Sequence, residues 1–296
     1  MDVKNPFNPA QVRKVSLLPP SAGNGASDGN EVSDDCAEVF AFWTRDPGSI
    51  LEHAEELEKR GWGFYVMTTL TAYPPVLEPN VPPPEEIILK MKLLADKISA
   101  DKVMWRYDPV FLSDLTSPDF HRRNFAYLAA RLRGTVNRVI VSVYDEYPAA
   151  EKRLAVLEQR GMLTRIAHYE KPRPGSFGGR SLTPELRALL AEFACIAHSE
   201  GMEIQSCAEE DLSDCKQPDC IQSGDSGIRS GACIDGEYIS RIFGVKVPGK
   251  DKGQRRPHCL CAQSVDIGAY GNCPAGCVYC YGLRTAFLTE KPSAKS

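Results

Sequence analysis

The chain has 296 residues, of which 43% are hydrophobic and 25% are charged, and its formal net charge is −4. These values are typical of a globular protein with one large α/β domain or two ordinary domains, and they exclude a generally basic surface for nucleic acid. No stretch reaches the ~18 apolar residues of a membrane span, and the first ten residues lack the apolar core of a signal peptide. We therefore expect a cytoplasmic protein with no membrane partner.

Strand-like and helix-like patterns alternate between about residues 36 and 210. Short runs rich in β-branched and aromatic residues predict strands at 38–44, 63–71, 102–108, 138–145 and 202–209. Apolar residues spaced by three and four predict helices at 49–61, 83–99, 117–134, 147–161 and 181–201. Such alternation implies parallel strands with right-handed crossovers. We expect an α/β fold, a full or partial parallel β/α (TIM-like) barrel, with a doubly wound open sheet as the alternative.

The periodicity fails beyond residue 210. Residues 211–282 are rich in glycine, cysteine and polar side chains, so this segment buries little apolar surface by itself. It needs a further constraint, which metal–thiolate bonds would supply. The sequence therefore predicts a barrel-like domain over 1–210 and a cysteine-rich, metal- or cluster-binding segment over 211–296 that packs on it.

Polar side chains follow each predicted strand, where ligands meet parallel sheets. The stretch "MWRYDP" is the most informative, because it sets Arg106 between aromatic residues inside an apolar run. An arginine there must pair, for example with Asp108 on the same strand face, or bind an anionic ligand. We therefore take Arg106 and Asp108 as the candidate catalytic residues. The other polar strand-end residues are Thr44, Arg45, Asp46, Thr68, Thr69, Thr71, Asp145, Glu146, Ser206 and Glu209.

The 11 cysteines are unevenly distributed, since ten of them fall between Cys195 and Cys280. Cysteines that only fill a core should be spread evenly, and a reducing compartment keeps thiols reduced, so this clustering indicates metal binding or catalysis. The densest group has the spacing C-x-x-x-C-x-x-C, formed by Cys273, Cys277 and Cys280.

Three kinds of site compete for this trio. One is a structural zinc site closed by a fourth thiolate, for which Cys259 or Cys261 is near in sequence. The second is a 4Fe–4S cluster with four protein thiolates. The third is the same cluster with three protein ligands and one open iron. The spacing, with Tyr279 before the last cysteine, is typical of radical S-adenosylmethionine enzymes and favours the third. S-adenosylmethionine would then bind the open iron, and the protein would need a reducing electron donor.

The chain also resembles a bacterial family catalogued as a domain of unknown function, DUF1848. The resemblance rests on "NPFNPAQVRKVSL", "FAFWTRDP", "TLTAYPPVLEPNVPP", "MWRYDPVFLSDLT" and "CLCAQSVDIGAYGNCPAGCVYCYG". It implies a radical-SAM-like protein distantly related to DNA repair photolyase and spore photoproduct lyase types. It does not name the substrate, which we expect to be a small molecule or a nucleic-acid derivative.

This sequence departs from the expected pattern in two ways. Radical SAM enzymes usually carry the cysteine loop after the first strand, whereas here it lies near the end of the chain, and no clear Gly-Gly-Glu motif follows the second strand. Members of the DUF1848 family usually begin with a further N-terminal strand. We therefore expect either that a strand is missing, which would leave an incomplete barrel with an unpaired edge, or that the start of the chain is misassigned.

Four more cysteines lie in stretches that match the family, namely Cys207, Cys233, Cys259 and Cys261. We interpret them as ligands of a second site, either another iron–sulfur cluster or zinc. Cys215 and Cys220 look like part of a local insertion, as surface thiols or substitute ligands. The alternative function is a non-catalytic protein with a structural zinc or closed iron–sulfur module, used for binding or redox sensing.

Overall fold

The fold is known from a computed structural model. It describes residues 11–16, 38–170, 181–209, 212–213, 227–247, 249, 258–267 and 273–283, without the side chains of 11–16, 38 and 266. The prediction for Cys215 and Cys220 concerns residues outside these ranges.

The described strands form one sheet with the order β7-β6-β5-β4-β3-β2-β1-β8. The strands from β2 to β7 are all parallel, while β1 is antiparallel to both of its neighbours, β2 and β8. The strands are β1 (Gln11–Ser16), β2 (Glu38–Thr44), β3 (Gly63–Thr69), β4 (Val103–Val110), β5 (Arg138–Val143), β6 (Glu203–Cys207), β7 (Arg229–Gly231) and β8 (Val265–Asp266).

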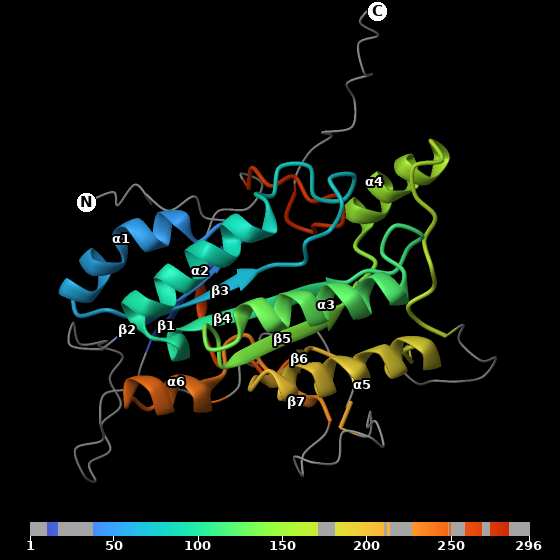
Figure 1. The fold of residues 1–296 in the computed structure, drawn as a ribbon. Helices are drawn as coiled ribbons and strands as arrows, with labels where there is room; N and C mark the ends of the chain where they lie inside the picture. Colours follow the sequence, from blue (N-terminus) through green and yellow to red (C-terminus); the bar gives the residue numbers. More distant parts are fainter. Residues whose placement is uncertain are drawn as a thin grey trace, which may run out of the picture.

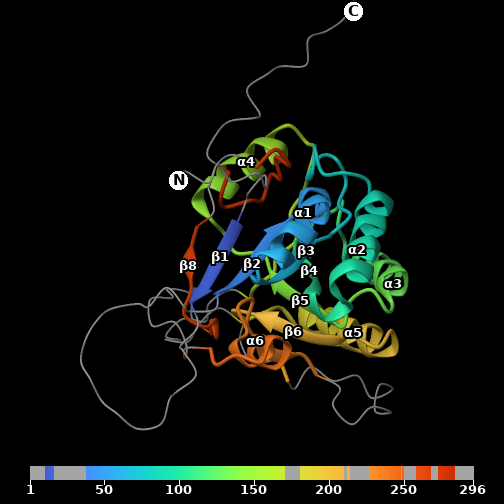
Figure 2. The same cartoon turned by 90° about the vertical axis from the view of Figure 1, so that its left-hand side faces the viewer.

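Helices follow the parallel strands in alternation. They are α1 (Gly48–Lys59), α2 (Pro84–Ile98), the short 3₁₀ helix η1 (Ala100–Lys102), α3 (Pro118–Leu132), α4 (Pro148–Gln159), α5 (Pro184–Ser199) and α6 (Gly236–Phe243). Helices α1, α2, α3 and α5 lie along one face of the sheet, and α6 lies below the opposite side (Figures 1 and 2). No described helix is long and apolar enough to cross a membrane.

The predicted alternation of strands and helices is confirmed as an α/β fold with six parallel strands. The order of the described strands has two ends, β7 and β8, so closure into a barrel is not observed in this part of the chain. The sequence did not predict β1, β7, β8 or α6. The strands β7 and β8 have only three and two residues, too few to show a period.

Local chemistry explains where the helices begin and end. Proline stands in the first turn of α2, α3, α4 and α5, where its missing N–H leaves no helical hydrogen bond unmade. Ser117 caps α3 by accepting a hydrogen bond from the Phe120 amide, and Thr183 caps α5 in the same way. Gly61 follows α1 with φ of +73°, a conformation that other residues adopt at a cost.

The main core lies between the sheet and its helices. Trp105 of β4 stacks on Phe125 of α3 with ring centroids 4.8 Å apart, and Phe125 stacks on Phe193 of α5 at 4.1 Å. All three side chains are fully buried. This aromatic stack joins β4, α3 and α5 into one rigid layer.

A smaller core covers the other face of the sheet. It contains Tyr65, Met67 and Met104 from the strands and Tyr238 and Ile239 from α6. Polar contacts hold α6 across the beginnings of the strands. Arg138 pairs with Asp235 at 2.6 Å, and the Tyr238 hydroxyl donates to the Asp101 carbonyl at 2.7 Å. Helix α6 is therefore packed on this second face, which we call the inner face of the sheet.

We predict that Phe125→Ala lowers the free energy of unfolding by about 3–5 kcal/mol, because it leaves a cavity between two stacked rings. Denaturant unfolding measures this change. The matched control is Leu93→Ala on α2, whose side chain is 47% exposed and whose loss should change the free energy by about 0.5 kcal/mol or less. Equal effects of the two substitutions would contradict the assigned core.

Candidate functional site

The cysteine loop (273–283) lies against the segment that follows β3, which we call the docking segment (74–81). The Asn80 amide donates to the Ala275 carbonyl at 3.2 Å, and the Val278 amide donates to the Leu77 carbonyl at 2.9 Å. The Asn80 side chain also donates to the Pro274 carbonyl at 3.0 Å. These bonds hold the loop at the edge of the sheet where the parallel strands end.

Arg153 of α4 anchors the loop from its other side. Its buried guanidinium donates to the carbonyl of Val278 at 2.8 Å, to that of Leu283 at 3.3 Å and to that of Cys280. Burial lowers the pKa of Arg153, and the nearby Cys280 opposes this effect. Three carbonyls of the loop therefore accept hydrogen bonds from a charged donor. Buried carbonyls need a hydrogen-bond partner, and bonds from a charged donor are the stronger ones.

Gly276 gives the loop its tight turn. Its φ is +65°, in the left-handed region that favours glycine. A Cβ atom there would lie 3.3 Å from the side-chain nitrogen, Nδ2, of Asn80. A larger residue would therefore strain the backbone and push on the docking segment.

The loop brings together the predicted trio of thiols. Cys277 is buried, Cys273 and Cys280 are half-buried, and all three belong to one apolar cluster with Tyr73 and Phe111. Burial raises the pKa of Cys277 to about 11, against the opposing positive charge of Arg45. Burial also raises the pKa of Cys273. Without a bound cation, these two thiols therefore stay protonated at neutral pH.

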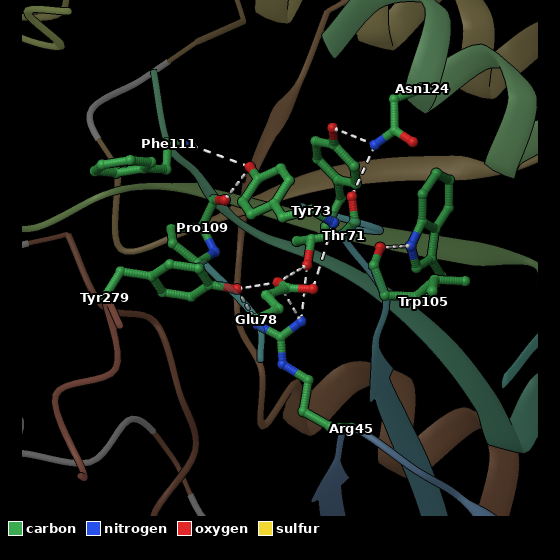
Figure 3. A network of polar contacts seen from close by, with 11 residues as sticks. Arg45, Thr71, Tyr73, Glu78, Trp105, Pro109, Phe111, Asn124 and Tyr279 are labelled. Carbon is green, nitrogen blue, oxygen red and sulfur yellow. Dashed lines mark hydrogen bonds and ion pairs between the residues drawn. The ribbon is translucent and has the colours of Figure 1, made fainter. Parts of the chain in front are cut away.

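Arg45 and Glu78 form a buried ion pair (Figure 3). Both side chains interact electrostatically with Cys277. Arg45, which follows β2, donates to Glu78 of the docking segment at 2.8 Å and to Thr71 at 2.7 Å. Tyr279 of the cysteine loop also contacts both Arg45 and Glu78 through its hydroxyl. The side chains of Arg45 and Glu78 are only 13% and 2% exposed. This network joins the end of β2, the docking segment and the cysteine loop at one point.

The groups around Arg45 keep its guanidinium protonated and positively charged. Burial by itself would lower the pKa of Arg45, but Cys277, Glu78 and Tyr279 outweigh it and hold this pKa well above its usual range. Burial raises the pKa of Tyr279, so its hydroxyl stays protonated and donates to Glu78. Arg45 is therefore a fixed positive charge next to the trio.

A second layer of hydrogen bonds supports this network. Asn124 donates to the Thr71 carbonyl at 2.7 Å and contacts the Tyr107 hydroxyl at 3.0 Å. Tyr107 lies 2.8 Å from His121 Nδ1, and His121 Nε2 lies 3.1 Å from the Phe111 carbonyl. Because a carbonyl only accepts, Nε2 carries the proton and Nδ1 accepts from Tyr107. His121 is thus a packed core residue.

Arg106 and Asp108 lie on the same face of β4 and form an ion pair. Ser142 of β5 donates to the other oxygen of Asp108. Burial by itself would lower the pKa of Arg106. Asp108 and the thiols of Cys233 and Cys207 outweigh this effect, so the pKa of Arg106 is raised. The buried Nε of Arg106 has no hydrogen-bond partner among the described residues.

The other four predicted cysteines also come together, in a group that we call the four-thiol group (Cys207, Cys233, Cys259 and Cys261). All four are buried in the core on the inner face of the sheet. Cys207 Sγ and Cys233 Sγ are 3.0 Å apart, and Cys261 is hydrogen-bonded to Cys207 and Cys259. These contacts favour the thiolate at Cys261 and Cys233, whose pKa values are lowered.

The two sets of thiols belong to different apolar clusters. Arg106 interacts with Cys233 and Cys207 and also with Tyr281 of the cysteine loop, so it lies between the sets. Within the described ranges, no three His, Cys, Asp or Glu side chains already surround a point where one metal ion would fit. Cys195 is half-buried on α5 and forms a disulfide, which differs from the expectation that the thiols are reduced.

Sequence reasoning missed two residues of the site. Glu78 lies in an apolar, proline-rich stretch, and a carboxylate in such a stretch was the available signal. Arg153 gave no signal, because "EKRLAVLEQ" reads as an ordinary amphipathic helix. Arg45 and Thr71, which we noted only as strand-end residues, proved to be central.

Comparisons with known proteins identify a family only. The family model of a domain of unknown function, DUF1848, matches residues 1–282. No curated protein and no solved structure matches the chain.

We predict that the Arg45–Glu78 pair contributes to stability as a unit. Arg45→Met leaves the Glu78 carboxylate buried without its cation and should lower the free energy of unfolding by about 3–5 kcal/mol. Glu78→Met should have a similar cost, and the double variant should be more stable than either single one. A double-mutant cycle on denaturant unfolding measures this coupling, and strictly additive costs would contradict it.

We predict a dependence on pH that comes from His121. Burial lowers the pKa of His121 from 6.5 to about 4, and the hydrogen bond to Phe111 only partly opposes this. Between these two values the unfolded chain binds more protons, so the free energy of unfolding falls as the pH falls from about 6.5 to about 4, by up to about 3 kcal/mol.

The variant His121→Gln should remove this part of the acid destabilisation. Unfolding free energies measured across the pH window for both proteins give the difference. His53→Gln on α1, at a half-exposed histidine, is the matched control and should keep the wild-type slope. An unchanged slope in His121→Gln would show that His121 does not titrate in this window.

Proposed function

This chain belongs to the DUF1848 family, and from that premise we propose that it is a radical-SAM-like iron–sulfur enzyme. In this proposal Cys273, Cys277 and Cys280 bind a 4Fe–4S cluster with one iron left open for S-adenosylmethionine. The observation that carries the proposal is the division of the described free thiols into a set of three and a separate set of four. The trio therefore has no fourth cysteine beside it among the described residues.

The chemistry of the donors fits such a cluster. A cubane cluster distributes its thiolates over different irons, so its ligands do not surround a single metal ion. The cluster, when bound, would supply the electron that cleaves S-adenosylmethionine to a deoxyadenosyl radical. The cysteine loop is held from both sides by Arg153 and the docking segment, which fixes the three thiols in place.

The residues around the trio have roles in this proposal. Arg45 provides a buried positive charge next to Cys277. In this proposal, that charge stabilises the thiolates and attracts a carboxylate. Arg106 and Asp108 lie toward the inner face of the sheet and form the substrate side. The unpartnered Nε of Arg106 leaves a donor for an anionic group of the substrate.

The finer features of the proposal follow from this chemistry. The sheet would be a partial TIM-like barrel with the cysteine loop over the ends of its strands. The enzyme would work in the cytoplasm, where a reducing electron donor is present. Its substrate would be a small molecule or a nucleic-acid derivative with an acidic group.

A second candidate function is a non-catalytic protein with a structural zinc or closed cluster, used for binding or redox sensing. The four-thiol group favours it, because four thiolates are a complete ligand set for zinc. The two functions differ at the trio, which has a catalytic role only in the first.

We predict that anaerobically purified protein is brown, contains iron and sulfide, and forms deoxyadenosine from S-adenosylmethionine and dithionite. Cys277→Ala should abolish deoxyadenosine formation while circular dichroism shows an intact fold, because the sheet does not depend on this side chain. Val278→Ala, in the same loop, keeps all three thiols and is the matched control. Deoxyadenosine formation retained in Cys277→Ala, or a colourless wild-type protein, would overturn the proposal.

A further inference from the structure

The four-thiol group joins three segments that are far apart in the sequence. Cys207 ends β6, Cys233 precedes α6, and Cys259 and Cys261 lie between α6 and β8. Their exposed fractions are between 5% and 7%, and they share one apolar cluster with Met104 and Ile140. Four buried sulfur atoms on one face of a sheet are an unusual way to fill a core, since cysteines with only a packing role have no reason to converge.

The backbone around the group is arranged to support it. The Ile234 amide donates to Cys261 Sγ at 3.5 Å, and the Ala262 amide donates to the Ile234 carbonyl at 2.8 Å. These bonds align the segment before α6 with the segment that carries Cys259 and Cys261. A backbone amide that donates to sulfur stabilises the thiolate form, which is the form that binds metals.

We propose that Cys207, Cys233, Cys259 and Cys261 bind a single zinc ion that ties these three segments together. Zinc prefers four thiolates in a closed tetrahedron when its role is structural. This inference does not depend on the function proposed for the trio, because the two sets of thiols lie in separate clusters.

The four thiols do not already surround a point where one ion would fit, so zinc binding requires an adjustment of their side chains. Four thiolates at about 2.3 Å from zinc lie about 3.8 Å from one another. Cys207 Sγ and Cys233 Sγ are 3.0 Å apart, so this pair needs to separate by less than about 1 Å to bind one ion.

The position of the group defines what the ion would do. Cys233 accepts a hydrogen bond from Tyr65 through its carbonyl at 3.0 Å, and Asp235, two residues later, caps α6 and pairs with Arg138. An ion at Cys233 would therefore hold α6 over the beginnings of the strands. Together with its four thiolates, the ion would form a site of net negative charge close to Arg106, on the side proposed for substrate.

Metal analysis of the full chain, purified anaerobically from cells supplied with both iron and zinc, tests this proposal. We expect about one zinc per chain, with four sulfur neighbours in the zinc X-ray absorption spectrum. Cys261→Ser should lose the zinc, whereas Cys277→Ser should keep it. The iron and deoxyadenosine results belong to the trio, so either proposal can fail while the other stands.

If Cys261→Ser does not fold, the zinc X-ray absorption spectrum of the wild-type protein still tests the proposal. A disulfide between Cys207 and Cys233, a second iron–sulfur cluster bound to these four thiols, or a metal-free group of four reactive thiols would each overturn the zinc assignment. Zinc with fewer than four sulfur neighbours would also overturn it.

Discussion

The arrangement of the site depends on the docking of the cysteine loop at the end of the parallel strands. This loop has little regular structure, so its backbone groups need partners from elsewhere once they are buried. The docking segment and Arg153 supply these partners on two sides. The buried network of Arg45, Glu78 and Tyr279 then fixes the loop to the end of β2.

A network of this kind is costly unless every member is satisfied. Moving a guanidinium and a carboxylate out of water requires close pairing and further hydrogen bonds, and here Thr71 and Tyr279 provide them. Such networks specify one arrangement of the chain. We interpret the network as the element that sets the position of Cys277, since Arg45 and Tyr279 both lie close to it.

Much of the fold could be predicted from the sequence, because the five strands are rich in β-branched and aromatic residues and the five helices have a clear period. The helix at 117–134, for example, is observed as α3 with Ser117 as its cap. Short or irregular elements such as β7 and α6 could not be predicted, since their stability comes from contacts with distant residues. Those contacts include the pairing of Arg138 with Asp235, which are 97 residues apart.

The site shows the same division between local and distant information. The spacing of Cys273, Cys277 and Cys280 is visible in the sequence, and so is the pairing expected of Arg106 with Asp108. The roles of Glu78 and Arg153 are not visible, because each depends on a loop about 125 to 200 residues away in the chain. The separation of the seven free thiols in the described ranges into three and four could only be seen after folding.

The most direct test of this account is a crystal structure of anaerobically prepared protein with anomalous diffraction recorded at the iron and zinc absorption edges. The account predicts an iron signal beside Cys277 and a zinc signal among Cys207, Cys233, Cys259 and Cys261. Iron absent from the loop, or one metal shared by cysteines of both sets, would contradict it.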